Sequence, residues 1–233
     1  MSIITESLFA PLTVATAPEA SRPMLGKVKK SLGFIPNLMG ILANNPTVLE
    51  GYLALGTVFE KGSFTPQERQ IILLAASFEN NCNYCAAEHS QIAKSLLHTP
   101  AEVIEAVHNN TPVSDAKLNG LVTLVRELVR ERGYAKEKTT RKFLAAGYKK
   151  EQVMELLLGI ALKTISNYLD HISLTPFEHR VAGGLPTKSR RTLTLVGNEI
   201  SFCPNRKRIG LFRIQSRAAL PFSAEVARRA ALA

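Results

Sequence analysis

The pattern of apolar and polar positions along the chain predicts helices. Between residues 46 and 183, apolar residues recur at intervals of three and four, which is the spacing of one helix face and not of a strand. The longest such stripe covers residues 153–172 and persists for about five turns, so we expect a long helix there that lines the core. A second stripe over residues 118–129 stops before Gly133, a residue type that commonly ends helices. The expected fold class is therefore all-α.

Two helix starts are marked by local residue order. Thr65 and Thr99 are each followed by proline and, three positions on, by glutamate (Glu68 and Glu102), which is the order of a capping box with proline at the first helical position. The helix that begins after Thr65 is expected to end at a polar break over residues 79–81. A new helix should then start at Cys82.

The chain divides near residue 184. We expect a helical domain over residues 1–184, with its core at about 25–183, followed by a basic tail over 185–233 that contains short strand-like stretches. Residues 1–185 carry 19 Lys and Arg against 17 Asp and Glu, whereas residues 186–233 carry 10 against 2. The net charge of +10 thus belongs mainly to the tail, which can be read as a disordered extension, an arm that contacts nucleic acid, or the product of a shifted reading frame.

Cysteine usage and hydropathy point to the cytoplasm. Three cysteines in 233 residues are too few to stabilise a secreted protein of this size by disulfide bonds, so we expect a reducing compartment. The N-terminus has no basic segment followed by an unbroken apolar one, so no secretory signal is predicted. We also expect no membrane partner, because no run of about 18 apolar residues occurs.

Candidate chemistry is concentrated in Cys82, Cys85 and His89. With Asn81 as N-cap, Cys82 and Cys85 would take the first and fourth helical positions and share a face with His89. A helix N-terminus and a nearby imidazole both favour a thiolate, so one thiol should be reactive near neutral pH. Attack of Cys85 on a peroxide would give a sulfenic acid, which Cys82 can convert to a disulfide, with His89 as proton carrier.

Two structural readings of the cysteines stay open. A structural zinc site needs four ligands, and Cys82, Cys85 and His89 supply three. Two inert, buried thiols are also conceivable, but the polar context NNCNYC speaks against deep apolar burial. Further along, the polar residues within 167–171 lie on or beside the long apolar stripe, where they could line the active-site cavity, form an oligomer contact or be purely structural.

The chain from about residue 8 to residue 181 resembles the carboxymuconolactone decarboxylase-like family, in particular its cysteine-bearing alkyl hydroperoxidase D (AhpD-like) branch. The resemblance is carried by three segments, LGFIPNLMGILANNPTVLEGYLAL, TPQERQIILLAASFENNCNYCAAEHS and AGYKKEQVMELLLGIALKTISNYLDHI. The specific part is the order C-x-x-C-x-x-x-H. The resemblance implies an all-helical fold that assembles as a trimer or hexamer and reduces hydroperoxides.

The same resemblance assigns roles to the three site residues. It implies that Cys85 is the peroxidatic cysteine, that Cys82 resolves it, and that His89 belongs to a proton relay. It also implies a dithiol electron donor, such as a lipoyl-bearing protein, and no cofactor: neither haem, flavin nor metal.

One position departs from the family pattern. The relay usually includes a glutamate twelve positions before the first cysteine, and Gln70 stands there in this chain. Glu68 and Glu79 are the candidate substitutes, although Glu68 already has a structural role in the predicted capping box. A weakened relay could mean slow peroxide turnover.

These observations favour an enzyme, a peroxiredoxin-type alkyl hydroperoxidase with an antioxidant role and no nucleic-acid partner. A carboxymuconolactone decarboxylase-type reaction is the second interpretation, but that chemistry does not need the cysteine pair. The third is a non-catalytic redox-sensing or nucleic-acid-binding protein that uses the basic tail, and it predicts salt-dependent binding that is lost when the tail is removed.

Overall fold

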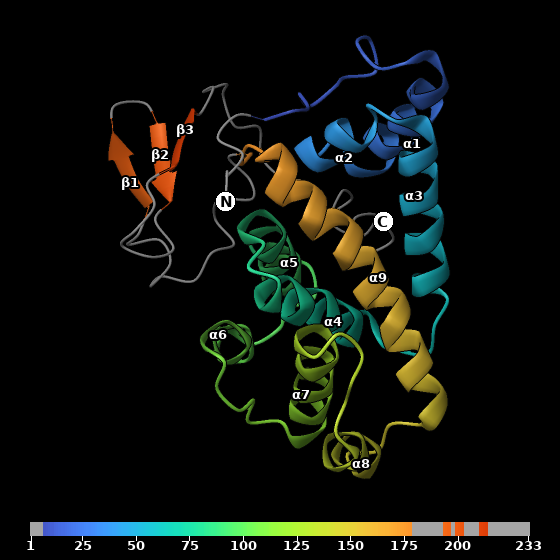
Figure 1. Cartoon of the computed structure of the whole chain (residues 1–233), viewed down its shortest axis with the longest axis vertical. Helices are drawn as coiled ribbons and strands as arrows, with labels where there is room; N and C mark the ends of the chain where they lie inside the picture. The colour runs from blue at the N-terminus through green and yellow to red at the C-terminus, as the bar shows by residue number, and fades with distance from the viewer. Residues whose placement is uncertain (1–6, 179–192, 197–198, 203–209, 214–233) are drawn as a thin grey trace.

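The structure is a computed structural model that describes residues 7–178 and the backbone of 193–196, 199–202 and 210–213. The prediction of an all-helical fold is confirmed for residues 7–178 (Figure 1). The elements of this part are η1 (Glu19–Ser21), α1 (Arg22–Leu32), α2 (Asn37–Leu42), α3 (Pro46–Glu60), α4 (Pro66–Glu79), α5 (Asn83–Ser95), α6 (Ala101–Asn109), α7 (Ala116–Arg130), α8 (Glu137–Ala145) and α9 (Lys150–Ser173).

Three short strands follow in the tail. They are β1 (Leu193–Val196), β2 (Glu199–Phe202) and β3 (Gly210–Arg213), and they form one antiparallel sheet in the order β1-β2-β3. Leu193 lies opposite Phe202, and Glu199 lies opposite Arg213. The first and third strands fall within the strand-like stretches that the sequence indicates over residues 192–196 and 209–214. The predicted domain boundary near 184 and Cys203 lie outside the described residues.

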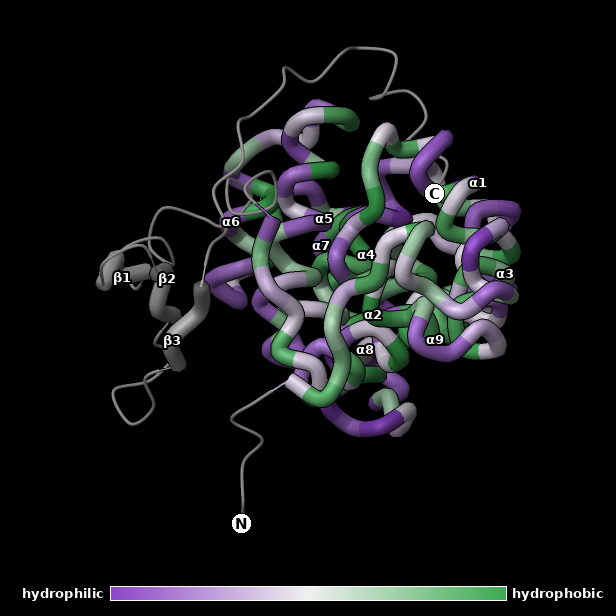
Figure 2. The backbone as a smooth tube through the Cα atoms, turned by 90° about the horizontal axis from the view of Figure 1, so that it is seen from above, coloured by the Kyte–Doolittle hydropathy of each residue, from purple (hydrophilic) through white to green (hydrophobic). Residues whose placement is uncertain are grey.

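Helix α4 is at the centre of the helical body. It contacts α5, α7 and α9, while α9 runs diagonally across the molecule between α3 and the α4–α5 pair (Figure 1). Eight of the fourteen residues of α4 are buried. Apolar segments gather around α4, and hydrophilic ones appear on outer turns such as those of α3 (Figure 2). Two of the helices that contact α4, α5 and α9, also contact each other.

The predicted helix starts are confirmed in one case and corrected in the other. At α4 the Thr65 hydroxyl accepts from the Glu68 N–H at 3.2 Å and the Glu68 carboxylate accepts from the Thr65 N–H at 2.9 Å, which completes the capping box. At α6 the N-cap is Pro100, with no side-chain cap, and not Thr99. Thr99 is instead buried, and its N–H donates to the Ala93 carbonyl at 2.9 Å.

The long helix predicted over residues 153–172 is present as α9, but its apolar stripe does not line the core throughout. Leu156 is buried as expected, whereas the stripe beyond it turns outward. The exposed apolar side chains of α9 are Met154, Leu157, Ile165, Tyr168 and Ile172. The buried face of the same helix carries polar residues, among them Lys163, Ser166 and Asn167. Periodicity thus found the helix, while its buried face is defined by other residues.

None of the helices in the described part of the chain is long and apolar enough to cross a membrane.

Gly40 in α2 lies where a side chain has no room. An added Cβ would sit 2.7 Å from the carbonyl oxygen and 2.9 Å from the amide nitrogen of Leu12. Because both atoms are backbone, we expect Gly40→Ala to lower the free energy of unfolding by about 1–3 kcal/mol in urea denaturation. Gly51→Ala in α3 is the matched control, since nothing lies within 4 Å of its Cβ position. That change should raise stability by up to about 1 kcal/mol, and equal stability of the two variants would contradict the packing argument.

Candidate dithiol site

The turn between α4 and α5 places the first cysteine. Asn81 adopts the left-handed conformation (φ 58°), its N–H donates to the Phe78 carbonyl at 3.1 Å, and the Cys82 N–H donates to the Ser77 carbonyl at 3.0 Å. These two bonds form the Schellman motif that ends α4. Asn81 is therefore the residue that closes one helix, and the prediction that it caps the next one is wrong.

Cys82 itself is the N-cap of α5. Its sulfur accepts from the Cys85 N–H at 3.3 Å, so Cys85 occupies the third helical position and not the fourth. His89 follows one turn later on the same helix. Both thiols are reduced and buried, with 1% and 0% of Cys82 and Cys85 exposed. The predicted grouping of the two cysteines and the histidine at the start of one helix is present.

Two helices supply the partners of His89. Its Nδ1 lies 2.9 Å from Oε1 of Gln70 in α4, the residue at the position of the family's relay glutamate. Its Nε2 lies 2.8 Å from Nζ of Lys163 in α9. Burial and the charge of Lys163 hold the pKa of His89 well below its usual range. The imidazole is therefore neutral near pH 7.

Helix α9 also provides polar partners for the thiols. The Cys82 thiol donates to Oδ2 of Asp170 at 3.4 Å. Asn167 accepts from the Asn80 amide at 3.0 Å through Oδ1, and its side-chain amide also hydrogen-bonds with Cys85. The sequence had placed these two α9 residues on or beside the apolar stripe. The structure brings them to the dithiol, which lies more than 80 positions earlier in the chain.

The two thiols are electrostatically different. Burial raises the pKa of Cys85, but the hydrogen bond from Cys82 and the charge of Lys163 outweigh it and lower the pKa to about 7. Burial, the hydrogen bond to Cys85 and the charge on that sulfur raise the pKa of Cys82 well above its usual range. Cys85 is therefore the thiol of the pair that ionises more readily near neutral pH, and the thiolate is the reactive form of a cysteine.

The two carboxylates proposed as relay substitutes lie elsewhere. Glu68 hydrogen-bonds with its own capping box and with Tyr148 at 3.0 Å, and it pairs with Lys117 at 2.9 Å. Glu79 forms a bidentate ion pair with Arg130, at 2.8 and 3.0 Å. Neither lines the cavity beside His89. Their carboxylates thus have other partners, whereas the hydrogen-bond partners of His89 are Gln70 and Lys163.

A cavity of about 500 Å³ opens beside His89, between α1, α3, α4 and α5. Most of its wall is apolar, and Tyr52, Gln70, Glu88 and His89 are among its polar lining residues. This volume is in the range of small-molecule sites. Neither cysteine lines the cavity, so a molecule that reaches Cys85 from it requires side-chain movement. In the described ranges, no group of His, Cys, Asp or Glu is arranged to hold a metal ion.

Sequence reasoning missed Lys163, Glu88 and Tyr52. Burial raises the pKa of Glu88 to about 8 against the opposing effect of Lys163. Tyr52 lies near the same lysine, and burial raises the pKa of its hydroxyl. One signal was available for Lys163, which is a single lysine within the otherwise uncharged stretch between Glu155 and Asp170. Nothing in the pattern indicated Glu88 or Tyr52.

Comparisons with known proteins agree with this fold. The model of the Carboxymuconolactone decarboxylase family matches residues 46–127, which include the dithiol and His89. An AhpD-core, peroxidase-related protein from Ralstonia eutropha has a TM-score of 0.67 at 20% identity, covering 78% of this chain and 98% of that one. A peroxidase-related protein from Silicibacter sp. has a TM-score of 0.64 at 16% identity, covering 77% and 97%.

A third similar structure has a different chemistry. A cysteine-to-alanine variant of the debrominase Bmp8, in complex with 2,3,4-tribromopyrrole, has a TM-score of 0.65 at 16% identity and covers 77% of this chain and 96% of that one. The search of curated protein sequences found no match. The helical body thus has the AhpD-like fold. The resemblance predicted from the sequence is confirmed over residues 46–127, where the model of the Carboxymuconolactone decarboxylase family matches this chain.

Proposed function

We propose that this protein is a thiol-dependent hydroperoxide reductase that uses Cys85 and Cys82. The observation that carries the proposal is the asymmetry of the two buried thiols. Cys85 has a pKa of about 7, while the neighbouring Cys82 keeps its proton. The two steps of peroxide reduction need a thiolate beside a protonated thiol. The Cys85 thiolate attacks the peroxide in the first step, and the Cys82 thiol reacts with the oxidised Cys85 in the second.

In the first step the Cys85 thiolate attacks the terminal oxygen of the hydroperoxide. The O–O bond breaks, Cys85 becomes a sulfenic acid, and the alkoxide leaves and takes up a proton to give the alcohol. The Lys163 ammonium, whose charge acts on Cys85, and its hydrogen-bond partner His89 can deliver this proton. The sulfur loses two electrons, and the peroxide gains them.

In the second step the Cys82 sulfur attacks the Cys85 sulfur. The S–O bond breaks, water leaves, and a Cys82–Cys85 disulfide forms. The single thiol proton of Cys82 has two acceptors in the resting site, the Cys85 sulfur and Asp170. Once Cys85 is oxidised it no longer attracts this proton, so Asp170 is the base that receives it and then passes it to the leaving hydroxide, which departs as water.

The cycle closes when an external dithiol reduces the disulfide by thiol–disulfide exchange. We propose a dithiol donor such as a lipoyl-bearing protein, a cytoplasmic setting and an antioxidant role, in keeping with the resemblance and the cysteine usage. The carboxymuconolactone decarboxylase-type alternative gains no support from the dithiol. The nucleic-acid alternative depends on the basic tail, whose side chains lie outside the described residues.

The direct test is the fate of the two thiols after one equivalent of an organic hydroperoxide. Thiol labelling and mass spectrometry should show a Cys82–Cys85 disulfide and one equivalent of alcohol. Disulfide formation without alcohol, or alcohol without loss of either thiol, would refute the proposed reaction. Cys203→Ser should be introduced first, so that the third thiol of the chain does not contribute.

We also propose that the protein is a homo-oligomer, a trimer or hexamer as the resemblance implies. The outer face of α9 presents apolar side chains over most of its length, including Met154 and Tyr168 with 73% and 56% exposed. Exposed apolar surfaces of this extent mark association sites. Light scattering should give a mass several times the 25.5 kDa of one chain.

Tyr168→Lys should shift the mass toward one chain, whereas Glu151→Lys at the exposed start of the same helix should not. A wild-type mass of one chain would contradict this assembly.

A further inference from the structure

Lys163 is a fully buried lysine next to the dithiol. None of its surface is exposed, although it lies near the middle of the long helix α9. Burial of an ammonium group is unfavourable unless hydrogen bonds and opposite charge compensate for it. Its Nζ lies 2.8 Å from Nε2 of His89. A neutral imidazole satisfies one donor of the ammonium but supplies no negative charge.

The contact with Lys163 determines the protonation of His89. An ammonium has three donors and no acceptor, so Nε2 of the imidazole must accept and Nδ1 must carry the proton. That Nδ1–H then donates to Oε1 of Gln70, at 2.9 Å. A second proton on His89 would place a buried cation against the lysine. His89 is thus held as a neutral ring by both of its neighbours.

The negative charge must come from the other groups that face the lysine. Cys85, Cys82 and Glu88 face it from α5, Tyr52 faces it from α3, and Asp170 lies on α9 itself. At neutral pH burial keeps Glu88, Tyr52 and Cys82 mainly protonated. Cys85 and Asp170 remain as the groups that can be anions opposite Lys163. Of these two, only Cys85 loses its charge when it is oxidised.

We propose that Lys163 is a positioning residue of the dithiol site: its buried ammonium keeps Cys85 ionised and holds His89 as the neutral Nδ1–H tautomer. The positive charge at the site is then supplied by a lysine of α9 and not by an imidazolium. Gln70 fits this arrangement, because its neutral amide accepts from His89 without favouring a charged ring. The role of Lys163 in the reaction rests on the proposed function. The test of its effect on Cys85 does not, because thiolate formation can be measured without peroxide.

The test measures thiolate formation without any peroxide. Alkylation of Cys85 by iodoacetamide, followed by peptide mass spectrometry in a Cys203→Ser background, gives the rate as a function of pH. In the parent protein the rate should be half-maximal at about pH 7. In Lys163→Met the midpoint should rise by about one pH unit or more, so the rate near pH 6 should fall about tenfold. Lys163→Arg keeps the charge and should stay close to the parent.

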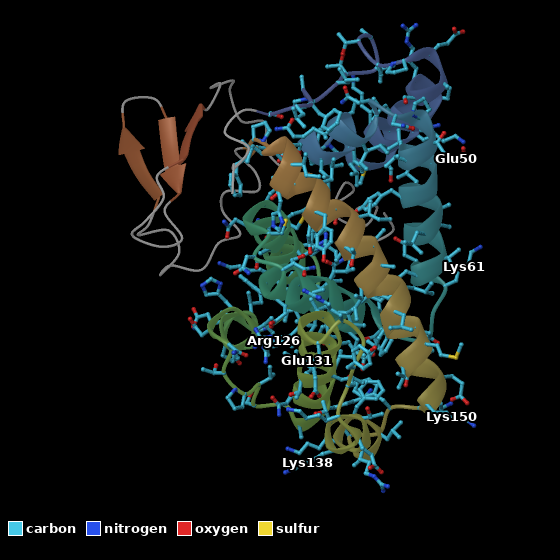
Figure 3. All side chains as sticks on the ribbon, in the orientation of Figure 1. Glu50, Lys61, Arg126, Glu131, Lys138 and Lys150 are labelled. Carbon is cyan, nitrogen blue, oxygen red and sulfur yellow. The ribbon has the colours of Figure 1, made fainter. Side chains whose placement is uncertain are left out.

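Lys150→Met is the matched control, because Lys150 lies in the first turn of the same helix and points into solvent (Figure 3). Its midpoint should be unchanged. A folded Lys163→Met protein whose midpoint stays with that of the parent would overturn the proposal. A shifted midpoint in a protein that consumes no peroxide would leave Lys163 assigned and refute the proposed function instead.

A second measurement needs no variant. Nitrogen-15 NMR of the histidine rings in the unaltered protein reports which nitrogen carries the proton. His89 should remain neutral with the proton on Nδ1 from about pH 8 down to about pH 6, below the usual histidine pKa. A ring protonated on Nε2, or one that titrates at the usual histidine pKa, would show that Lys163 does not fix it.

Discussion

Cys85→Ser is expected to abolish dithiol-dependent consumption of hydroperoxide. The serine hydroxyl stays protonated at neutral pH, whereas the Cys85 thiol has a pKa of about 7 and is half ionised there. Without that anion nothing at the site can attack the peroxide, and the rate should fall to that of the donor alone. Peroxide loss with a saturating dithiol is the measurement.

Cys82→Ser should behave differently, because it keeps the attacking sulfur. One equivalent of peroxide should be reduced per chain, after which Cys85 remains a sulfenic acid that a sulfenic-acid reagent labels. Cys203→Ser is the control and should retain full turnover. Equal residual turnover in the Cys85 and Cys82 variants would show that the assignment of the two roles is wrong.

Asp170→Asn is expected to slow disulfide formation while leaving the reaction with peroxide intact. Asp170 accepts the thiol hydrogen bond of Cys82 at 3.4 Å, and its Oδ1 has no hydrogen-bond partner among the described residues. Burial raises the pKa of this carboxyl, which brings it nearer to that of a thiol and improves it as a base. General bases typically contribute about 100-fold or more.

Rapid mixing with peroxide separates the two steps. Sulfenic acid should form at the parental rate in Asp170→Asn, and the disulfide should then appear about 100-fold more slowly. Raising the pH should partly restore the second step, because hydroxide can replace the lost base. Glu151→Gln is the control, since this carboxylate lies at the exposed start of the same helix. Parental disulfide formation in Asp170→Asn would remove Asp170 from the mechanism.

The helices could be predicted from the sequence because each depends on neighbours in the chain. The capping box at Thr65 and the period of the apolar positions are local features, and α4 and α9 appear where they indicate. The Asn81 turn shows the limit of such reasoning. Asparagine suits both an N-cap and the left-handed position that closes a helix, and the preceding helix decided between them.

In the candidate site, too, the local features could be predicted and the long-range contacts could not. Cys82, Cys85 and His89 were predicted together because they lie on successive turns of one helix. The surroundings of the two candidate relay carboxylates could not be predicted, because the partners of a carboxylate come from distant parts of the chain. Glu79 pairs with Arg130, which lies 51 positions later, and no local pattern predicts such a pair.

The sequence by itself determined that the chain is helical over its main domain, that a dithiol begins one helix and that a histidine follows it. Only the tertiary structure decided what surrounds that dithiol. Lys163 reaches His89 across 74 positions of sequence, and Asp170 reaches Cys82 across 88. Hydrophobic periodicity could not find this face of α9, because it assigns apolar residues to the interior. Here the buried face is polar, since hydrogen bonds and charge within the site compensate for burial, and much of the apolar stripe is exposed.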